Sequence, residues 1–143
     1  MNVRDILFQV EREWHAKTPS SEAEIAQLVS QAKAQLPTEY VELLRLTNGG
    51  EGPLALSPLY FQLSSVKECL ELFHNNQQLL EQFPRFMFFG SNGGLELIAF
   101  DLRSGQPPWP IVMVDPIAGP ESAKEIAPDV MTFIGAIGLE SEV

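Results

Sequence analysis

The chain has little cysteine and little histidine. Cys69 is the one cysteine among 143 residues, and the two histidines, His15 and His74, lie far from it and from each other in the sequence. An internal disulfide is therefore excluded, and the closely spaced ligand pairs of a zinc site are missing. We expect no metal and no cofactor. A free thiol suits a reducing cytoplasm, where we expect the protein to act.

Long apolar runs are also missing. The N-terminal segment "MNVRDILFQVEREW" has a short apolar run interrupted by charged residues, so it does not look like a signal peptide. No apolar stretch approaches the roughly 20 residues that a helix needs to cross a bilayer. We therefore expect a soluble intracellular protein without a membrane partner.

Basic side chains are scarce. The chain has 9 basic and 19 acidic residues, and residues 48–143 alone carry 4 basic and 12 acidic ones. Negative charge of this size repels nucleic acid and anionic lipid, so neither is expected as a partner. The same charge favours a basic partner protein through electrostatic steering, or it serves only to keep the protein soluble.

What is present is the composition of a globular domain. Hydrophobic residues make up 45% of the chain, and its length is that of one core, so we expect a single domain over residues 1–143. Helical patterns come first, strand patterns follow, and a helical pattern ends the chain. This order predicts an α+β fold in which N-terminal helices pack on a mainly antiparallel sheet, with a C-terminal closing helix.

Amphipathic helices are predicted throughout the first 47 residues. The apolar stripes of the first two comprise Val3, Ile6, Leu7, Val10 and Trp14, then Ile25, Leu28, Val29 and Ala32. Ser21 and Glu24 form a capping box before the second stripe. A third helix begins at Pro37, turns Tyr40, Leu43 and Leu44 inward, and ends at Asn48, Gly49 and Gly50, which tolerate positive φ.

Two further helices are predicted later in the chain. Ser65 and Glu68 form the capping box of a fourth helix, and Asn75-Asn76 is the point at which that helix can break. The closing helix begins at Pro128 and has an inward face of Val130, Phe133, Ile134 and Ile137. Both histidines fall on predicted helices among polar neighbours, and we interpret them as surface residues.

Strand patterns occupy the middle of the chain. The segments "RFMFFG", "LELIAFDL" and "PIVMVD" each read as a strand, and the second has apolar residues on both alternating faces, so we expect it to be covered on both sides. The segment "PLALSPLYFQLS" contains Pro53 and Pro58, which predicts an irregular or edge strand because proline cannot donate to a sheet ladder.

The glycine-rich segment from Gly90 to Gly94 raises the question of a substrate-binding loop. A nucleotide P-loop needs a lysine, but none occurs between Lys67 and Lys124. A dinucleotide fingerprint needs a following helix, whereas a strand follows here. Ser91 comes directly after Gly90, so the spacing of a nucleophile elbow is absent. We therefore interpret the segment as a hairpin connection in which the glycines and Asn92 supply positive φ.

No catalytic residue is indicated elsewhere. Cys69 falls on the apolar face of the fourth helix, which favours a buried packing thiol over a nucleophile. Carboxylate pairs such as Glu39 with Glu42 are expected by chance among 19 acidic residues. Trp109 lies between prolines, and the sequence leaves two readings open: an exposed contact aromatic, or a side chain packed over the edge of the sheet.

Two glycine-containing blocks in this order resemble the SUKH superfamily, whose eukaryotic members are the Smi/Knr cell-wall regulators. The blocks are "LPTEYVELLRLTNGGEG" and "FFGSNGGLELIAFDL", followed by "PIVMVD" and "VMTFIGAIG". The resemblance spans roughly residues 14 to 138 and implies an α+β fold without enzymatic activity. It implies that the glycine positions, here Gly49, Gly50, Gly90, Gly93 and Gly94, together with Asn48, shape turns.

In bacteria the resemblance implies an immunity protein that binds and blocks a cognate polymorphic toxin, often a nuclease or deaminase. The alternatives are a Smi/Knr-like interaction or scaffold module and, less favoured, a hydrolase or small-molecule-binding protein. On physical grounds, polar groups near the two glycine turns and the sheet are the candidate partner-binding residues: Glu51, Asn92, Glu96, Asp101 and, in its exposed reading, Trp109. A basic toxin domain is the expected partner.

Overall fold

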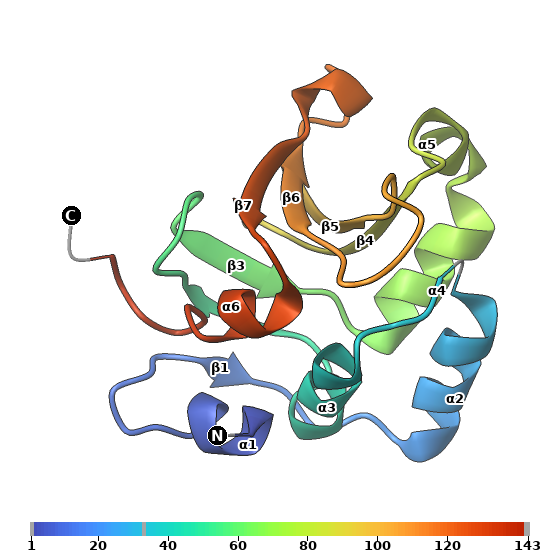
Figure 1. Cartoon of the computed structure of the whole chain (residues 1–143). Coiled ribbons are helices and arrows are strands. Elements are labelled where there is room, and N and C mark those ends of the chain that lie inside the picture. Colours follow the sequence, from blue (N-terminus) through green and yellow to red (C-terminus); the bar gives the residue numbers. More distant parts are fainter. Residues whose placement is uncertain (1, 33, 142–143) are drawn as a thin grey trace.

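The computed structural model describes residues 2–32 and 34–141 and has the α+β fold that the sequence predicts (Figure 1). The helices are α1 (Val3–Leu7), α2 (Glu22–Gln31), α3 (Thr38–Leu46), α4 (Val66–Asn75), α5 (Gln77–Gln82) and α6 (Val130–Ile134), with a short 3-10 turn η1 (Pro120–Ser122). The strands are β1 (His15–Ala16), β2 (Gly50–Pro53), β3 (Tyr60–Leu63), β4 (Phe86–Ser91), β5 (Leu97–Asp101), β6 (Ile111–Val114) and β7 (Lys124–Ala127). They form one antiparallel seven-stranded sheet whose spatial order follows the chain.

The capping boxes of two helices are confirmed. Ser21 accepts from the amide of Glu24, whose carboxylate accepts from the Ser21 amide in return, and Ser65 and Glu68 do the same at α4. These reciprocal bonds satisfy amide groups that the first helical turn leaves without partners, so they fix where each helix begins. The predicted break at Asn75-Asn76 is also confirmed, because α4 ends at Asn75 and α5 begins at Gln77.

The first helix is shorter than its apolar stripe predicts. It ends at Leu7, Val10 is fully exposed at 100%, and Trp14 instead stacks on Phe61 with ring centroids 5.9 Å apart. His15 lies in β1 and not on a helix. The helical interpretation of residues 8–15 is therefore wrong. The conformation of this segment is determined by its contacts with distant elements and not by its apolar periodicity.

Two other helix boundaries differ by one or two residues from the expectation. Pro37 is the N-cap of α3 and not its first helical residue, and Asp129, not Pro128, caps α6 by accepting from the amide of Thr132. The predicted inward residues of α3 and of the closing helix are buried, whereas Val29 of α2 is exposed. However, α6 ends at Ile134, so the buried Ile137 lies beyond the helix in which it was predicted. The stripes therefore identify the buried faces better than they identify the helix ends.

The segment predicted as an irregular or edge strand forms two strands with an interior position. β3 pairs with β2 on one side and β4 on the other. Pro53 ends β2 and Pro58 lies in the turn that follows, so neither proline removes a hydrogen bond from the interior ladder. The edges of the sheet are instead β1 and β7, two short strands that the sequence did not indicate.

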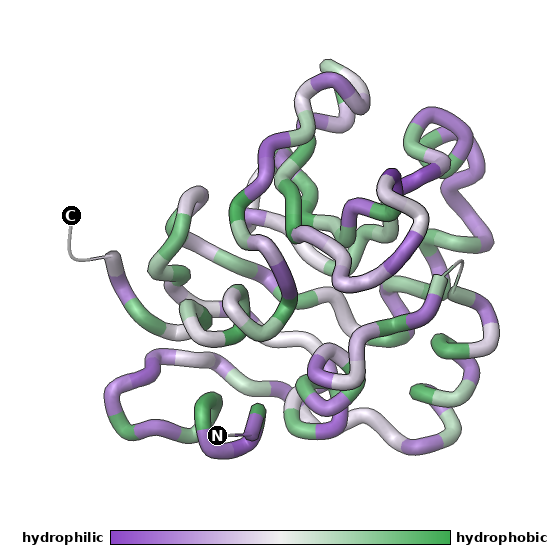
Figure 2. The backbone as a smooth tube through the Cα atoms, in the orientation of Figure 1, coloured by the Kyte–Doolittle hydropathy of each residue, from purple (hydrophilic) through white to green (hydrophobic). Residues whose placement is uncertain are grey.

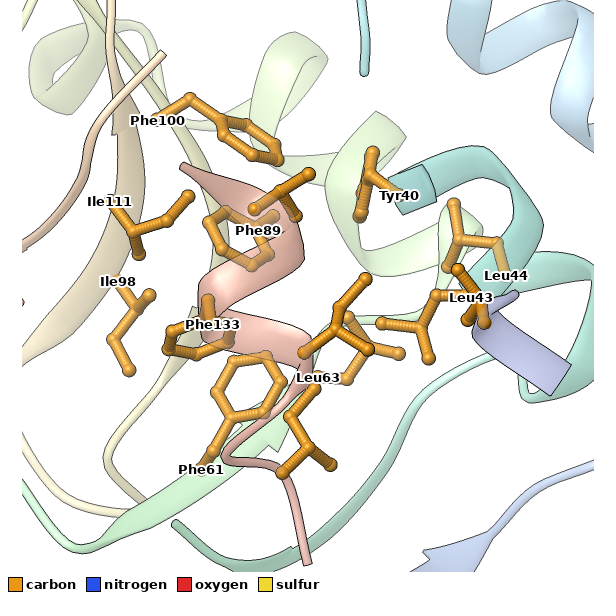
Figure 3. Packing of buried hydrophobic residues seen from close by; sticks show 14 of the residues in the cluster. Tyr40, Leu43, Leu44, Phe61, Leu63, Phe89, Ile98, Phe100, Ile111 and Phe133 are labelled. Carbon is orange, nitrogen blue, oxygen red and sulfur yellow. The ribbon is translucent and has the colours of Figure 1, made fainter. Parts of the chain in front are cut away.

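Both faces of the central strands are covered. The larger hydrophobic cluster, here called the main core, lies between one face of the sheet and helices α1, α3, α4 and α6, and the hydrophobic stretches of the chain follow the central strands (Figures 1 and 2). In Figure 3, Phe61, Phe89 and Phe133 meet at its centre, and the rings of Phe61 and Phe133 lie edge to face at 4.8 Å. A smaller cluster of Phe83, Phe86, Phe88, Ala99, Val112 and Val114 covers the opposite face of β4–β6. The predicted two-sided burial of β5 is thus confirmed.

Candidate functional site

The candidate site is the face of strands β1–β4 that points away from the main core. Phe61 and Leu63 of β3 point into the core, so their neighbours Tyr60 and Gln62 point outward. The strand register places other polar side chains beside them. We call this set the outer polar face: His15, Glu51, Tyr60, Gln62 and Ser91.

Hydrogen bonds join the outer polar face across three strands. The Tyr60 hydroxyl donates to Oε2 of Glu51 at 2.6 Å, and Nε2 of Gln62 donates to the same oxygen at 3.1 Å. Oγ of Ser91 donates to Oε1 of Gln62 at 3.3 Å. Because Glu51, Tyr60, Gln62 and Ser91 are each held by a neighbour on the next strand, most of this surface is ordered before any partner arrives.

The electrostatics of the face centre on Glu51. Hydrogen bonds from Tyr60 and then Gln62 lower the pKa of the Glu51 carboxyl, with smaller contributions from the nearby His15 and Lys17. The same hydrogen bond raises the pKa of Tyr60. At neutral pH the pair is therefore a carboxylate with a neutral phenol beside it, which presents negative charge to solvent.

The β4–β5 turn lies against this face. A Cβ on Gly93, whose φ is +82°, would lie 3.1 Å from the Tyr60 ring. Within the turn, Oδ1 of Asn92 accepts from the amide of Gly94 at 2.9 Å, and Nδ2 of Asn92 donates to Oε1 of Glu96 at 3.2 Å. The turn therefore brings two further polar side chains next to the outer polar face.

The glycines act in two different ways. Gly49 and Gly50 have positive φ, and a Cβ on Gly50 would also lie 2.7 Å from the carbonyl oxygen of His15, so this glycine lets β1 approach β2. Gly90 lies within β4, where a Cβ would meet the Gln62 carbonyl oxygen at 2.4 Å. Of the residues in segment 90–94 that were expected to supply positive φ, only Gly93 has it, so the expectation is wrong for Gly90, Asn92 and Gly94. Asn48 acts through its side chain, whose Oδ1 accepts from the amide of Val66 at 2.8 Å.

Two hollows border the outer polar face. One, of about 210 Å³, is lined by Lys17, Glu51, Gln62, Glu68 and Ser91 among others. The second, of about 480 Å³, lies toward the β2–β3 turn and is lined by residues from both ends of the chain. Tyr60 lines the second hollow, and a hollowed surface of this kind can fit the side chains of another molecule.

The structure brings together three of the five candidate partner-binding residues. Glu51, Asn92 and Glu96 lie around Tyr60. Asp101 lies at the other end of β5, opposite Phe86, and forms an ion pair of 2.8 Å with Arg103. Burial favours the neutral form of Asp101, but the hydrogen bonds and charge of Arg103 outweigh it and lower the pKa of the carboxyl.

Trp109 does not have the exposure that its contact reading requires. Its side chain is 5% exposed, and Nε1 donates to the carbonyl oxygen of Gln35 at 2.9 Å. The ring therefore packs inside the molecule and joins the β5–β6 connection to the segment between α2 and α3.

Four members of the outer polar face were missed as site residues in the sequence: His15, which was placed on a helix, and Tyr60, Gln62 and Ser91. Polar and apolar residues alternate in "YFQLS", and this alternation is the signal that could have placed Tyr60 and Gln62 on one exposed face. The two prolines nearby masked it. Ser91 has no comparable signal, because its position is set by pairing with Gln62.

The one thiol is placed as a packing residue. Cys69 is 2% exposed, its neighbour is the hydroxyl of Tyr40 at 3.8 Å, and burial raises the pKa of the thiol to about 11. A group that is protonated and buried at neutral pH is a poor nucleophile. Among residues 2–32 and 34–141, no cluster of histidine, cysteine, aspartate and glutamate could hold a metal ion. None of the helices in that part of the chain is long and apolar enough to span a bilayer.

These observations define the class: an α+β domain with a consecutive antiparallel sheet, two glycine-shaped turns and an open polar face. A model of the SMI1 / KNR4 family (SUKH-1) matches residues 19–136, and the chain belongs to this family. The resemblance inferred from the two glycine blocks is thereby confirmed. A comparison with curated proteins found no match. The matched region begins after β1, so α1 and β1 lie outside it.

Proposed function

We propose that this chain is an immunity protein that binds a toxin domain and blocks it without catalysis. The observation that carries the proposal is an open, acidic sheet face on a SUKH fold. Glu51 is charged at neutral pH, and the whole chain has a net charge of −10. A toxin that acts on nucleic acid, such as a nuclease or deaminase, has a basic surface, which an acidic protein can cover.

Within this proposal, Glu51, Asn92 and Glu96 are the contact residues, and Tyr60 and Gln62 join them. The network of hydrogen bonds across β2–β4 supports this assignment, because side chains that are already ordered lose less entropy on binding. Asp101 is a weaker candidate because Arg103 already neutralises it. Trp109 is buried and serves the packing of the domain, so we no longer assign it to the contact surface. The protein would act in the cytoplasm, where an incoming toxin meets its target.

The proposal predicts that a toxin domain is encoded beside this chain, and the test is rescue of growth from that domain. Co-expression of the wild-type chain should restore growth, and the purified proteins should form a complex whose affinity falls with salt. The double variant Glu51→Lys/Glu96→Lys should weaken the complex by about 100-fold, because two repulsions replace two attractions. Growth arrest despite co-expression, with no complex between the purified proteins, would overturn the proposal.

The matched control is Glu125→Lys. Glu125 is exposed on β7, at the opposite edge of the sheet from β1, and the substitution changes net charge by the same amount per site. If the contact surface is the outer polar face, this variant should bind almost as the wild type does. A loss in Glu125→Lys that is about half that of the double variant in free energy, or about tenfold in affinity, would mean that only net charge matters.

A second function is favoured by the family description. The matching model is that of the SMI1 / KNR4 family, which supports an interaction or scaffold module that recruits partners without neutralising a toxin. The same surface would then bind a housekeeping protein. Rescue of growth separates the two functions, because a scaffold module leaves an adjacent toxin active.

A further inference from the structure

The larger of the two hollows has features that fit one kind of side chain. It measures about 480 Å³ and is lined by Glu13, His15, Pro53, Leu59, Tyr60 and Glu140, among others. The N- and C-terminal segments meet at its rim, where the amide of Glu13 donates to the carbonyl oxygen of Gly138 at 2.7 Å. The hollow is therefore built jointly by β2, β3 and both ends of the described chain.

Large apolar side chains are exposed at this hollow. Leu59 is 55% exposed and Tyr60 is 36% exposed. Leu59 has a φ of +76° and is the one non-glycine residue with positive φ in the part of the chain that the structure describes. A bulky side chain is unfavourable in this conformation, where glycine is free of strain. The backbone conformation of the turn does not favour leucine, so we interpret the exposed side chain of Leu59 as part of a contact surface.

The rim of the hollow carries carboxylates that form no ion pair within the described residues. Glu13 and Glu140 are exposed and line the hollow. Glu51 is not part of the lining, but it accepts a hydrogen bond from the hydroxyl group of Tyr60, which is. The ion pairs within the described residues are Arg45 with Glu22 and Arg103 with Asp101, so none of these three carboxylates takes part in one. A cation that enters the hollow would meet unpaired carboxylates on more than one side.

We propose that this hollow receives an arginine side chain from a basic loop of the partner protein. The inference rests on the proposed function, since the loop would belong to the same toxin domain. The planar guanidinium stacks on the face of Tyr60, its methylene groups lie against Leu59, and its N–H groups donate to Glu13 and Glu140. Arginine fits better than lysine, because lysine offers a compact, strongly hydrated charge that neither stacks nor donates in a fork.

The direct test is a titration of the full chain, followed by amide NMR, with the blocked peptide acetyl-Gly-Arg-Gly-Arg-Gly-amide and its lysine counterpart. The arginine peptide should shift the amides of His15, Gly52 and Tyr60 in a saturable way and bind about threefold more tightly than the lysine peptide. Shifts spread evenly over the acidic surface, or equal affinity for the two peptides, would overturn the inference.

Variants extend the test. Glu13→Gln/Glu140→Gln should weaken the arginine peptide by about tenfold, whereas Glu125→Gln, which removes a carboxylate at the far edge, should have no effect. Leu59→Gly should weaken it by about threefold while the melting temperature stays level or rises, because glycine suits the positive φ. Unchanged binding in both the double variant and Leu59→Gly would overturn the assignment of the hollow.

The failure of this inference can be told apart from the failure of the proposed function. If the wild-type chain binds the adjacent toxin domain and Glu13→Gln/Glu140→Gln binds it equally well, the hollow is not the contact and the immunity function stands. If the wild-type chain neither binds nor neutralises the toxin, the proposed function fails. The peptide titration then still decides whether the hollow selects arginine.

Discussion

At the scale of single residues, the carboxylate of Glu51 places a negative charge at a fixed position on the outer polar face. It accepts from two side chains of the neighbouring strand, and both bonds favour its ionised form. Single acidic residues are common in a chain of this composition, but one fixed by a phenol hydroxyl has a defined direction. Under the proposed function, this fixed orientation distinguishes Glu51 from a carboxylate that only adds solubility.

Replacing the phenol by a phenyl ring tests this link. In Tyr60→Phe, the pKa of the Glu51 carboxyl should rise, because the first of its stabilising hydrogen bonds is lost. In the wild type, the pKa of Glu51 is lower in the folded state than in the unfolded state. The hydrogen bond therefore stabilises the fold at pH values above the unfolded-state pKa, and this stabilisation is lost as pH falls through the folded-state pKa. A carbon-detected NMR titration of the carboxyl checks this, and an unchanged pKa would contradict the hydrogen bond.

Gly50 gives a second prediction at this scale. Gly50→Ala combines positive φ with a Cβ 2.7 Å from the His15 carbonyl oxygen, so it should destabilise the protein by about 2–3 kcal/mol and detach β1. Gly105→Ala is the matched control, because Gly105 has φ +84° but nothing within 4 Å of the added Cβ. Its cost should be about 1 kcal/mol. Equal losses in urea unfolding would show that backbone strain alone, and not the approach of β1, explains the glycine.

At the scale of elements, the sequence predicted the features that depend on local signals and did not predict those that depend on long-range contacts. The capping boxes of α2 and α4 and the hairpin that joins β4 to β5 depend on neighbours within a few residues, so the sequence predicted them. β1 has two residues, and its existence depends on pairing with β2 far along the chain. Its two-residue pattern has no periodicity to detect, which is why His15 was assigned to a helix.

The candidate site divides in the same way. Glu51, Asn92 and Glu96 follow from their closeness to the glycine turns, which the sequence marks plainly. Asp101 follows a strand that the sequence also marks, but the register of that strand places it at the opposite end from the turns. The burial of Trp109 depends on a contact with Gln35, which lies 74 positions earlier in the chain. Sequence patterns do not contain such a contact.

Arg12 gives the prediction for elements. Its Nη1 donates to the carbonyl oxygens of Gly135 at 3.0 Å and Ile137 at 2.7 Å, so it closes the C-terminal end of α6. Burial lowers the pKa of this guanidinium, which still leaves it charged at neutral pH. Arg12→Met should cost about 1.5–3 kcal/mol, because buried carbonyl groups lose a charged donor.

Arg4→Met is the control for that measurement. Arg4 lies on the exposed side of α1 with its guanidinium 5.8 Å from the centre of the Phe8 ring, an arrangement of little energetic weight at a surface. Urea unfolding should detect almost no change. A loss in Arg12→Met no larger than in Arg4→Met would mean that the bonds to α6 contribute nothing to stability.

At the scale of the whole molecule, both ends of the chain are tied to the matched region. Residues before position 19 and after position 136 lie outside the family match. Even so, Arg12 donates to the carbonyl oxygen of Gly135 and the amide of Gly138 donates to the carbonyl oxygen of Pro53, and both acceptors lie inside the match. We therefore keep the prediction of a single domain over residues 1–143. Its unfolding should be one cooperative transition.

The two tryptophans test this prediction. Trp14 reports on the N-terminal segment and Trp109 on the contact between the β5–β6 connection and the segment before α3. The single-tryptophan variants Trp14→Phe and Trp109→Phe should each show a fluorescence midpoint in urea that coincides with that of circular dichroism. An earlier midpoint for the Trp14 signal would mean that the N-terminal segment unfolds independently.

The strands occupy the sheet in the order of the chain, and this has a consequence for synthesis on the ribosome. Each new strand finds its neighbour already made, so pairing can advance as the polypeptide emerges. Phe133 and the carbonyl groups that Arg12 binds follow all seven strands in the chain. A nascent chain can thus pair its strands while the main core still lacks α6, and the core is covered on that side only after residues 130–137 have left the ribosome.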